Sequence, residues 1–303
     1  MDYFELFKLT AFKNLCDIAN DFKKKLDTVI NTNNNLTGIL SGFEGLDAIT
    51  KGFQPSNLIL IGGAPGMGKT SFAISLIRKM ALENKIPTAF FSLQMNANQI
   101  MTSIISQETN IVYEKLRLGD LDENDRQVIS EKLKWLNYHC LDISDYPFRT
   151  ITEIENELSF QPPDYAKVLI IDPLDCISKT KKDKTEKVLN KKEITQIACR
   201  LKKIAEKYNV VVIAFFDIKN KKHNNKRPTL LQVRKKAPID TYADLVLLLY
   251  RPEYYKIDEW DGDEEDPTAG QAEIVIAKNN HGFLKNIRIQ FNGDKKGFDN
   301  LNN

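Results

Sequence analysis

Short apolar runs alternate along most of the chain with segments whose apolar residues recur at helical spacing. Seven runs have the length of strands, and the first several are apolar at every position, as is typical of strands covered on both faces of a sheet. These expected strands span residues 57–61, 88–92, 167–171, 210–215, 244–249, 272–277 and 286–291. Helices are expected between them, for example over residues 70–83 and 188–208. The alternation predicts an α/β fold with a doubly wound, mainly parallel sheet.

The two ends of this pattern differ from its middle. The last two expected strands follow each other with no room for a helix, so they are expected to form an antiparallel edge of the sheet. Before the first strand, apolar residues recur at helical spacing over residues 3–30, and the polar run 31–35 then interrupts them. We therefore expect an N-terminal helix and linker over residues 1–36 and a globular domain over residues 37–303. The helix packs either on its own domain or on a neighbouring molecule.

Composition restricts the class of protein. Hydrophobic residues make up 42% of the chain, enough to bury a substantial core, and the net charge of +2 favours no class of partner. The four cysteines lack CxxC spacing, which argues against a zinc site or a disulfide framework. The N-terminus has no secretion signal, and no apolar run approaches the roughly eighteen residues of a membrane span. A cytoplasmic protein without a membrane segment is expected.

A glycine-rich segment between an expected strand and an expected helix carries the clearest chemistry. It satisfies the pattern G-x-x-x-x-G-K-[ST] and consists of Gly63, Ala64, Pro65, Gly66, Met67, Gly68, Lys69 and Thr70. Its glycines let backbone N–H groups curl around phosphate oxygens, and the start of the following helix attracts the same anion. Lys69 supplies positive charge to the β- and γ-phosphates, and the Thr70 hydroxyl is placed to ligate Mg²⁺. This phosphate loop predicts binding of a nucleoside triphosphate, ATP with Mg²⁺.

An acidic residue that fits the same site follows a later strand. The apolar run 167–171 delivers Asp172 to its C-terminal end, which is where open α/β sheets bind their ligands. We expect Asp172 to orient the Mg²⁺ shell together with Thr70. The alternative role for Asp172 is that of a helix cap.

Further motifs occur in a defined order along the chain. They are TGILSGFEGLD from Thr37, the phosphate loop, FSLQM from Phe91, the strand before Asp172, VIA from Val212, KRP from Lys226, ADLVLLLYR up to Arg251 and AKNNHG from Ala277. In this order they resemble the C-terminal, RecA-like ATPase domain of DnaB-type replicative DNA helicases. The resemblance covers about residues 1–303, with the N-terminal helix corresponding to the family's linker helix. The family's separate N-terminal helical domain is absent from this pattern.

The resemblance implies a RecA-like P-loop NTPase that assembles into a homo-hexamer. Such a ring threads single-stranded DNA through its centre and hydrolyses ATP at its subunit interfaces. By position, the resemblance implies catalytic roles for Lys69, Gln94, Asp172 and Lys278, and it places Arg251 at the nucleotide. The expected partners are single-stranded DNA and a replicative helicase, primase or loader.

Basic residues gather in two segments that follow neighbouring strands. Residues 179–192 hold seven lysines, and residues 219–227 hold five basic residues and no acid. Two such loops could form a positive wall that follows a phosphate backbone, and the alternative is a solvated basic surface. The candidate DNA-binding residues are Lys181, Lys182, Lys184, Lys219, Lys221 and Lys222.

Three positions depart from the family pattern and bear on hydrolysis. Gln94 stands where the family has a glutamate that polarises the attacking water, and an amide cannot accept a proton. Asn280 stands where the family has an arginine that, with the lysine at Lys278, reaches the neighbouring subunit's γ-phosphate. Asp217 replaces a glutamine that senses the γ-phosphate, and its charge is expected to repel that group. A relocated base, Asp217 or Asp175, would be needed for brisk hydrolysis.

Three functions follow from these observations. The first is an ATP-binding, DnaB-like DNA helicase acting on single-stranded DNA in replication, with weakened hydrolysis. The second is a catalytically impaired regulator or loader that uses ATP binding to assemble on DNA or with a replicative helicase. The third is a RecA-like recombination mediator, against which the FSLQM motif and the linker helix argue.

Overall fold

The computed structural model describes residues 14–16, 18–20, 22–23, 37–136, 140–162, 165–178, 189–219, 226–261 and 266–301. The chain divides into two compact units, Met1–Thr37 and Gly38–Asn303. The helix expected over residues 3–30 lies largely outside the described residues, although the described residues between 15 and 23 are helical. All of the sheet and the candidate site belong to the larger unit.

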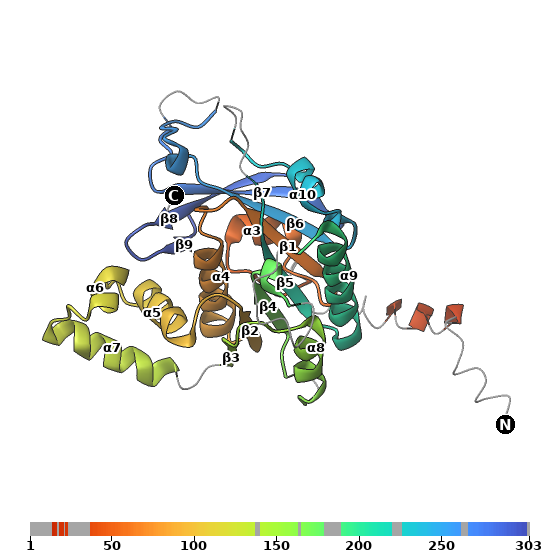
Figure 1. Cartoon of the computed structure of the whole chain (residues 1–303), viewed down its shortest axis with the longest axis horizontal. Coiled ribbons are helices and arrows are strands. Elements are labelled where there is room, and N and C mark those ends of the chain that lie inside the picture. Colours follow the sequence, from red (N-terminus) through yellow and green to blue (C-terminus); the bar gives the residue numbers. More distant parts are fainter. Residues whose placement is uncertain are drawn as a thin grey trace. The chain divides into compact units, whose positions relative to one another are not determined.

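One sheet forms the centre of the larger unit (Figure 1). Within the described residues it has nine strands: β1 (Leu58–Gly63), β2 (Thr88–Ser92), β3 (Leu141–Ser144), β4 (Val168–Asp172), β5 (Val211–Asp217), β6 (Leu245–Tyr250), β7 (Gln271–Asn279), β8 (Asn286–Asn292) and β9 (Gly297–Asp299). Their order is β3-β2-β4-β5-β1-β6-β7-β8-β9, and neighbours are parallel from β3 to β6 and antiparallel from β6 to β9. The predicted parallel sheet with antiparallel edge strands is confirmed.

Helices cover both faces of the sheet. One face packs against α3 (Glu44–Thr50), α4 (Lys69–Ile77) and α5 (Ala97–Glu108), and the other against α8 (Ile151–Ser159), α9 (Lys191–Tyr208) and α10 (Leu230–Lys236). Within the described residues of this unit, the remaining helices are α6 (Tyr113–Leu118), α7 (Glu123–Leu136), a π-helical turn at Arg78–Glu83 and 3-10 turns at Leu174–Cys176, Ile239–Thr241 and Glu253–Tyr255. Because successive side chains of a strand point to opposite faces, Ile59 and Ile61 of β1 join the first core and Leu58 and Leu60 the second.

The boundaries differ from the predicted ones where side chains redirect the backbone. Helix α9 begins at Lys191 rather than at residue 188, because Asn190 and Glu193 form a capping box in which each side chain accepts the other's backbone N–H, at 3.0 and 2.8 Å. The helix expected over residues 70–83 begins one residue earlier and ends as the π-helical turn. Strands β3 and β9 were not predicted, because both are very short and carry polar residues.

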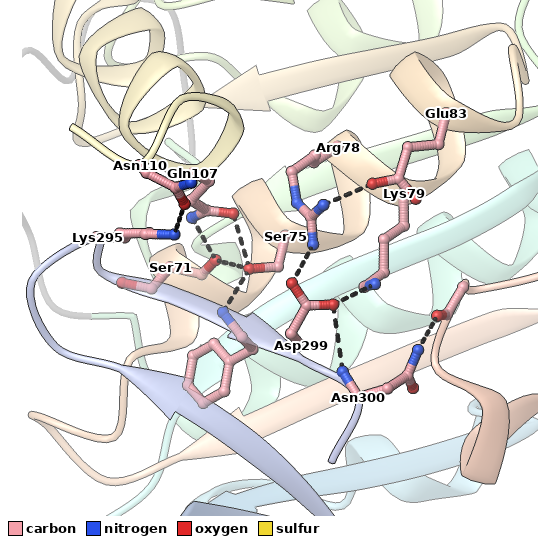
Figure 2. A network of polar contacts seen from close by, with 12 residues as sticks. Ser71, Ser75, Arg78, Lys79, Glu83, Gln107, Asn110, Lys295, Asp299 and Asn300 are labelled. Carbon is pink, nitrogen blue, oxygen red and sulfur yellow. Dashed lines mark hydrogen bonds and ion pairs between the residues drawn. The ribbon is translucent and has the colours of Figure 1, made fainter. Parts of the chain in front are cut away.

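The C-terminal segment is fixed to α4, the helix that follows the phosphate loop, and to the π-helical turn that continues α4 (Figure 2). Asp299 forms ion pairs with Arg78 at 2.8 Å and with the buried Lys79 at 2.7 Å. The Ser75 hydroxyl of α4 accepts the backbone N–H of Phe298 at 2.9 Å. The Phe298 ring meets Phe72 of α4 edge to face, with centroids 5.5 Å apart. The last strand therefore holds the helix whose first turn builds the candidate site.

Candidate nucleotide-binding site

The phosphate loop connects the end of β1 to the start of α4. Gly66 and Gly68 have φ values of +85° and +84°, in the left-handed region that favours glycine. A Cβ on Gly66 would lie 2.5 Å from the Tyr254 ring, and one on Gly68 would lie 2.9 Å from the Phe298 ring. These two glycines are therefore required by conformation and by space.

The first turn of α4 presents backbone donors at the loop. Its N-cap, Gly68, offers no side chain to cap the helix, and its first turn contains no acidic residue. The N–H groups at the start of a helix need partners from outside it, and the helix dipole makes an anion a favourable one. This turn and the glycine curve before it form a cradle that fits a phosphate group.

Lys69 lies over this loop and is engaged on two sides. Its ammonium lies 3.2 Å from the Ala64 carbonyl oxygen, to which it donates, and 2.7 Å from the carboxylate of Asp217. Asp217 ends β5, the strand beside β1, and it pairs in register with Gly63. A carboxylate therefore lies against the lysine of the phosphate loop, a contact that the sequence analysis did not predict.

Asp172 ends β4 and is buried, with 4% of its surface exposed. The Thr70 hydroxyl donates a hydrogen bond to its carboxylate. Burial raises the pKa of Asp172 from an ordinary value of 3.8 to about 6, although the Thr70 hydrogen bond and the nearby Lys69 partly oppose that rise. A hydroxyl and a carboxylate in contact are the hard oxygen ligands that Mg²⁺ takes, and a bound cation would remove the penalty of burying this charge.

The raised pKa of Asp172 predicts that its ionised carboxylate, the form that would bind Mg²⁺, lowers the stability of the nucleotide-free protein. Above pH 6 the nucleotide-free protein holds a buried carboxylate ion, whereas below about pH 4 the group is protonated in both the folded and the unfolded chain. Asp172→Asn should therefore raise the free energy of unfolding at pH 7.5 by about 1–3 kcal/mol, and the gain should vanish near pH 4. For a domain of this size, each kcal/mol corresponds to a melting temperature shift of about 2–4 °C.

Thermal unfolding of the nucleotide-free protein at pH 7.5 and pH 4 measures this effect. Asp120→Asn, at an exposed position between α6 and α7, is the matched control and should leave the melting temperature unchanged at both values. A variant at Asp172 that is no more stable than the parent at pH 7.5 would contradict the buried carboxylate ion.

Gln94 lies at the same edge of the sheet. It follows β2, which pairs with β4 so that Ser92 faces Asp172. The Gln94 side chain is exposed, and its amide nitrogen donates to the Cys176 sulfur at 3.3 Å. In this position its amide oxygen can orient a water molecule but cannot take a proton from it.

Asp175, one of the two candidates for a relocated base, is engaged elsewhere. Its carboxylate accepts the backbone N–H of Asp217 at 2.9 Å and forms an ion pair with Lys236. Asp175 therefore fixes the end of β5, next to the phosphate loop.

Arg251 contacts the phosphate loop, whereas Lys278 does not. The Arg251 guanidinium donates to the Gly66 carbonyl oxygen at 3.3 Å and stacks on the Phe291 ring, 3.6 Å from its centroid. The Lys278 ammonium donates to the carbonyl oxygens of Asp240 and Ala243 at 2.8 and 2.7 Å.

The sheet register explains the place of Lys278. This residue pairs with Val246 at the start of β6, and β6 runs parallel to β1. The phosphate loop follows the opposite end of β1, so Lys278 lies at the other end of the sheet from the loop of its own chain. The exposed Asn280 follows directly after β7, at the same end as Lys278.

Most of the candidate DNA-binding residues fall outside the described part of the chain. Lys219 is exposed just after β5. The others, Lys181, Lys182, Lys184, Lys221 and Lys222, lie outside the described residues. Their two segments leave β4 and β5, which are neighbours in the sheet. Among the described residues no helix combines the length and apolar character needed to cross a membrane.

Comparison with known proteins gives a consistent result. The family model for the DnaB-like helicase C terminal domain matches residues 38–300. A probable replicative DNA helicase of Trieres chinensis is 34% identical over 268 residues, which cover 87% of this chain and 57% of the relative. The replicative DNA helicase DnaC of Bacillus subtilis is 30% identical over 295 residues, covering 96% of this chain and 63% of the relative.

Solved structures of other proteins have a similar fold. One solved structure, described as an ATPase domain, superimposes with a TM-score of 0.81 at 25% sequence identity, covering 94% of this chain and 99% of that one. This chain spans about three-fifths of the length of the two helicases named above. The family model covers most of the chain, and the sheet order and phosphate loop agree with it. This chain belongs to the family of DnaB-like helicase C-terminal domains.

Proposed function

We propose that this chain is the ATP-binding motor domain of a DnaB-like replicative helicase that acts on single-stranded DNA. The observation that carries the proposal is the phosphate loop at the end of β1, with Gly66 and Gly68 in the left-handed region, Lys69 over the loop and the buried Asp172 at the end of β4. The names of the relatives, replicative DNA helicases, agree with this function. DNA-stimulated turnover of ATP by the purified protein tests it.

Each residue of the site has a distinct task in this proposal. The backbone N–H groups of the loop and the Lys69 ammonium bind the phosphates, and Arg251 lies beside the loop. Thr70 and Asp172 would hold Mg²⁺, which would supply positive charge to neutralise the phosphates. Gln94 orients water without removing its proton.

The place of Lys278 and Asn280 supports the proposal of a homo-hexameric ring. Both lie at the opposite end of the sheet from the phosphate loop of their own chain, so they can serve a nucleotide only in a neighbouring copy. In a closed ring, each copy presents this end to the next copy's loop. With asparagine in place of an arginine there, and with Gln94, the ring hydrolyses ATP slowly.

A second candidate function is a regulator or loader of a replicative helicase that binds ATP with little turnover. The ion pair between Lys69 and Asp217 favours this second function, because the Asp217 carboxylate binds the ammonium group that would otherwise bind the phosphates. The two functions differ in one measurement, since only a motor increases its ATP turnover when single-stranded DNA is added.

Reversing the charge of Lys221 and Lys222 should weaken binding of single-stranded DNA of every sequence. Each neutralised phosphate releases counterions, so the logarithm of affinity falls with the logarithm of salt concentration with a slope of about −0.7 per phosphate. Loss of two contacts should therefore make the slope shallower by about 1.4. Fluorescence anisotropy with a labelled oligonucleotide across a salt series measures both quantities.

The matched control reverses two exposed lysines on other surfaces, Lys134 on α7 and Lys203 on α9. It changes the net charge equally and should leave the salt slope unchanged. Equal losses in both variants would mean that only net charge matters and that the loop after β5 is solvated surface.

A further inference from the structure

The carboxylate of Asp217 occupies the outer side of the Lys69 ammonium. The two groups are 2.7 Å apart, and the Lys69 side chain is 12% exposed whereas that of Asp217 is 52% exposed. The other contact of this ammonium is the Ala64 carbonyl oxygen within the loop, at 3.2 Å. Among the described residues, Asp217 is thus the carboxylate that forms an ion pair with this lysine.

The backbone of Asp217 is fixed, so its side chain stays within reach of Lys69. Its N–H donates to Asp175 at 2.9 Å, and its carbonyl oxygen accepts from the Lys236 ammonium at 2.7 Å. The next residue, Ile218, donates to the Gly63 carbonyl oxygen at 3.1 Å. Three hydrogen bonds therefore tie this strand end to the phosphate loop and its surroundings, and only the half-exposed carboxylate can rotate.

The position of Asp217 makes it sensitive to one phosphate in particular. The lysine of a phosphate loop meets both the β- and the γ-phosphate. Asp172 and Asp217 lie at the carboxyl ends of β4 and β5, and a γ-phosphate bound to Lys69 would share this ammonium with Asp217. A bound diphosphate would leave the ion pair between Lys69 and Asp217 intact. A bound triphosphate would bring a second anion to the same ammonium group.

We propose that Asp217 is a specificity-determining residue that takes the place of the γ-phosphate on Lys69 and makes the site prefer nucleoside diphosphate over triphosphate. The inference rests on the proposed nucleotide-binding function of the same loop. With ADP bound, the ion pair between Lys69 and Asp217 persists. With ATP bound, the carboxylate must leave the lysine and still lies beside a like charge. The ion pair therefore favours the nucleotide-free and diphosphate-bound states over the triphosphate-bound state.

Titration calorimetry with ADP and with an ATP analogue whose β–γ bridge cannot be hydrolysed, both with excess Mg²⁺, tests this inference. The parent should bind ADP more tightly than the analogue. Asp217→Asn keeps the shape and removes the charge, and it should improve affinity for the triphosphate relative to ADP by about tenfold. Bringing like charges together disfavours the triphosphate, and the exposure of Asp217 to solvent limits this effect to about tenfold.

Two further variants sharpen the test. Asp217→Glu keeps the carboxylate and should keep the preference for diphosphate, whereas Asp217→Ser removes the charge and should behave like the asparagine variant. Asp120→Asn removes an exposed charge far along the chain and should change neither affinity. Raising the salt concentration should reduce the difference between the two nucleotides in the parent and have less effect in Asp217→Asn.

The outcomes separate this inference from the function on which it rests. If both nucleotides bind in a manner that requires Lys69 but their affinity ratio is the same in parent and Asp217→Asn, the inference is overturned and the function stands. A variant that loses triphosphate binding would also overturn it, because Asp217 would then be a ligand of the nucleotide. A parent that binds neither nucleotide refutes the proposed function and the inference together.

Discussion

Lys69→Ala should weaken ATP binding by about 10²-fold or more. The Lys69 ammonium is a positive group over the loop, 3.2 Å from the Ala64 carbonyl oxygen. Hydrogen bonds to a charged group contribute about 1.5–3 kcal/mol each, and this lysine makes one to each of two phosphates. Two such bonds correspond to a loss of about 10²-fold to 10⁴-fold in affinity.

The alanine variant also leaves Asp217 beside the phosphates without its partner, which adds repulsion. The double variant Lys69→Ala with Asp217→Asn separates the two effects, and we expect it to recover part of the affinity but not all of it. Lys203→Ala, on the exposed face of α9, controls for loss of one positive charge. A Lys69→Ala variant that binds ATP as tightly as the parent would show that residues 63–70 are not the nucleotide site.

Gln94→Glu combined with Asn280→Arg should raise ATP turnover at least about tenfold. A glutamate after β2 restores a base at the edge of the sheet where Asp172 ends β4, and general-base assistance is typically worth about 10²–10⁴ in rate. An arginine after β7 restores positive charge against the transferring phosphate, which in other P-loop enzymes is worth about 10³–10⁵. The expected gain is smaller because neither substituted side chain has evolved supporting contacts here.

The two substitutions act at opposite ends of one chain's sheet, so their joint effect requires two copies. Turnover should therefore rise with protein concentration in step with oligomer formation, as measured by a coupled ATPase assay beside light scattering. A mixture of the two single variants should recover part of the gain, because some interfaces then contain both new residues. Single variants assayed alone should gain less than the double variant.

Two results would contradict this prediction. A parent that already hydrolyses ATP briskly in the presence of DNA would show that another residue serves as base. A double variant that assembles but stays inactive would show that other residues limit hydrolysis. Asp217, which forms an ion pair with Lys69, would then be the next residue to replace.

Local patterns in the sequence were sufficient for much of the fold and for part of the candidate site. The parallel strands other than β3 were predicted to within one or two residues because strands covered on both faces are apolar at every position. The phosphate loop was predicted because its chemistry depends on neighbours in sequence, with glycines, a lysine and a hydroxyl within eight residues. Asp172 followed from the rule that ligands bind at the carboxyl ends of parallel strands.

Contacts between distant segments were decided only by the tertiary structure. The ion pair between Lys69 and Asp217 depends on β5 lying beside β1 with Asp217 opposite Gly63, and a single sequence does not reveal which strands pair. Strand β9 is too short to be stable alone, and it forms because Phe298 binds α4 and Asp299 binds Lys79 of the π-helical turn that follows α4. Lys278 lies away from its own loop because β7 runs antiparallel to β6. The sequence by itself thus determined the chemistry that one segment carries, whereas strand order and register decided which charges meet.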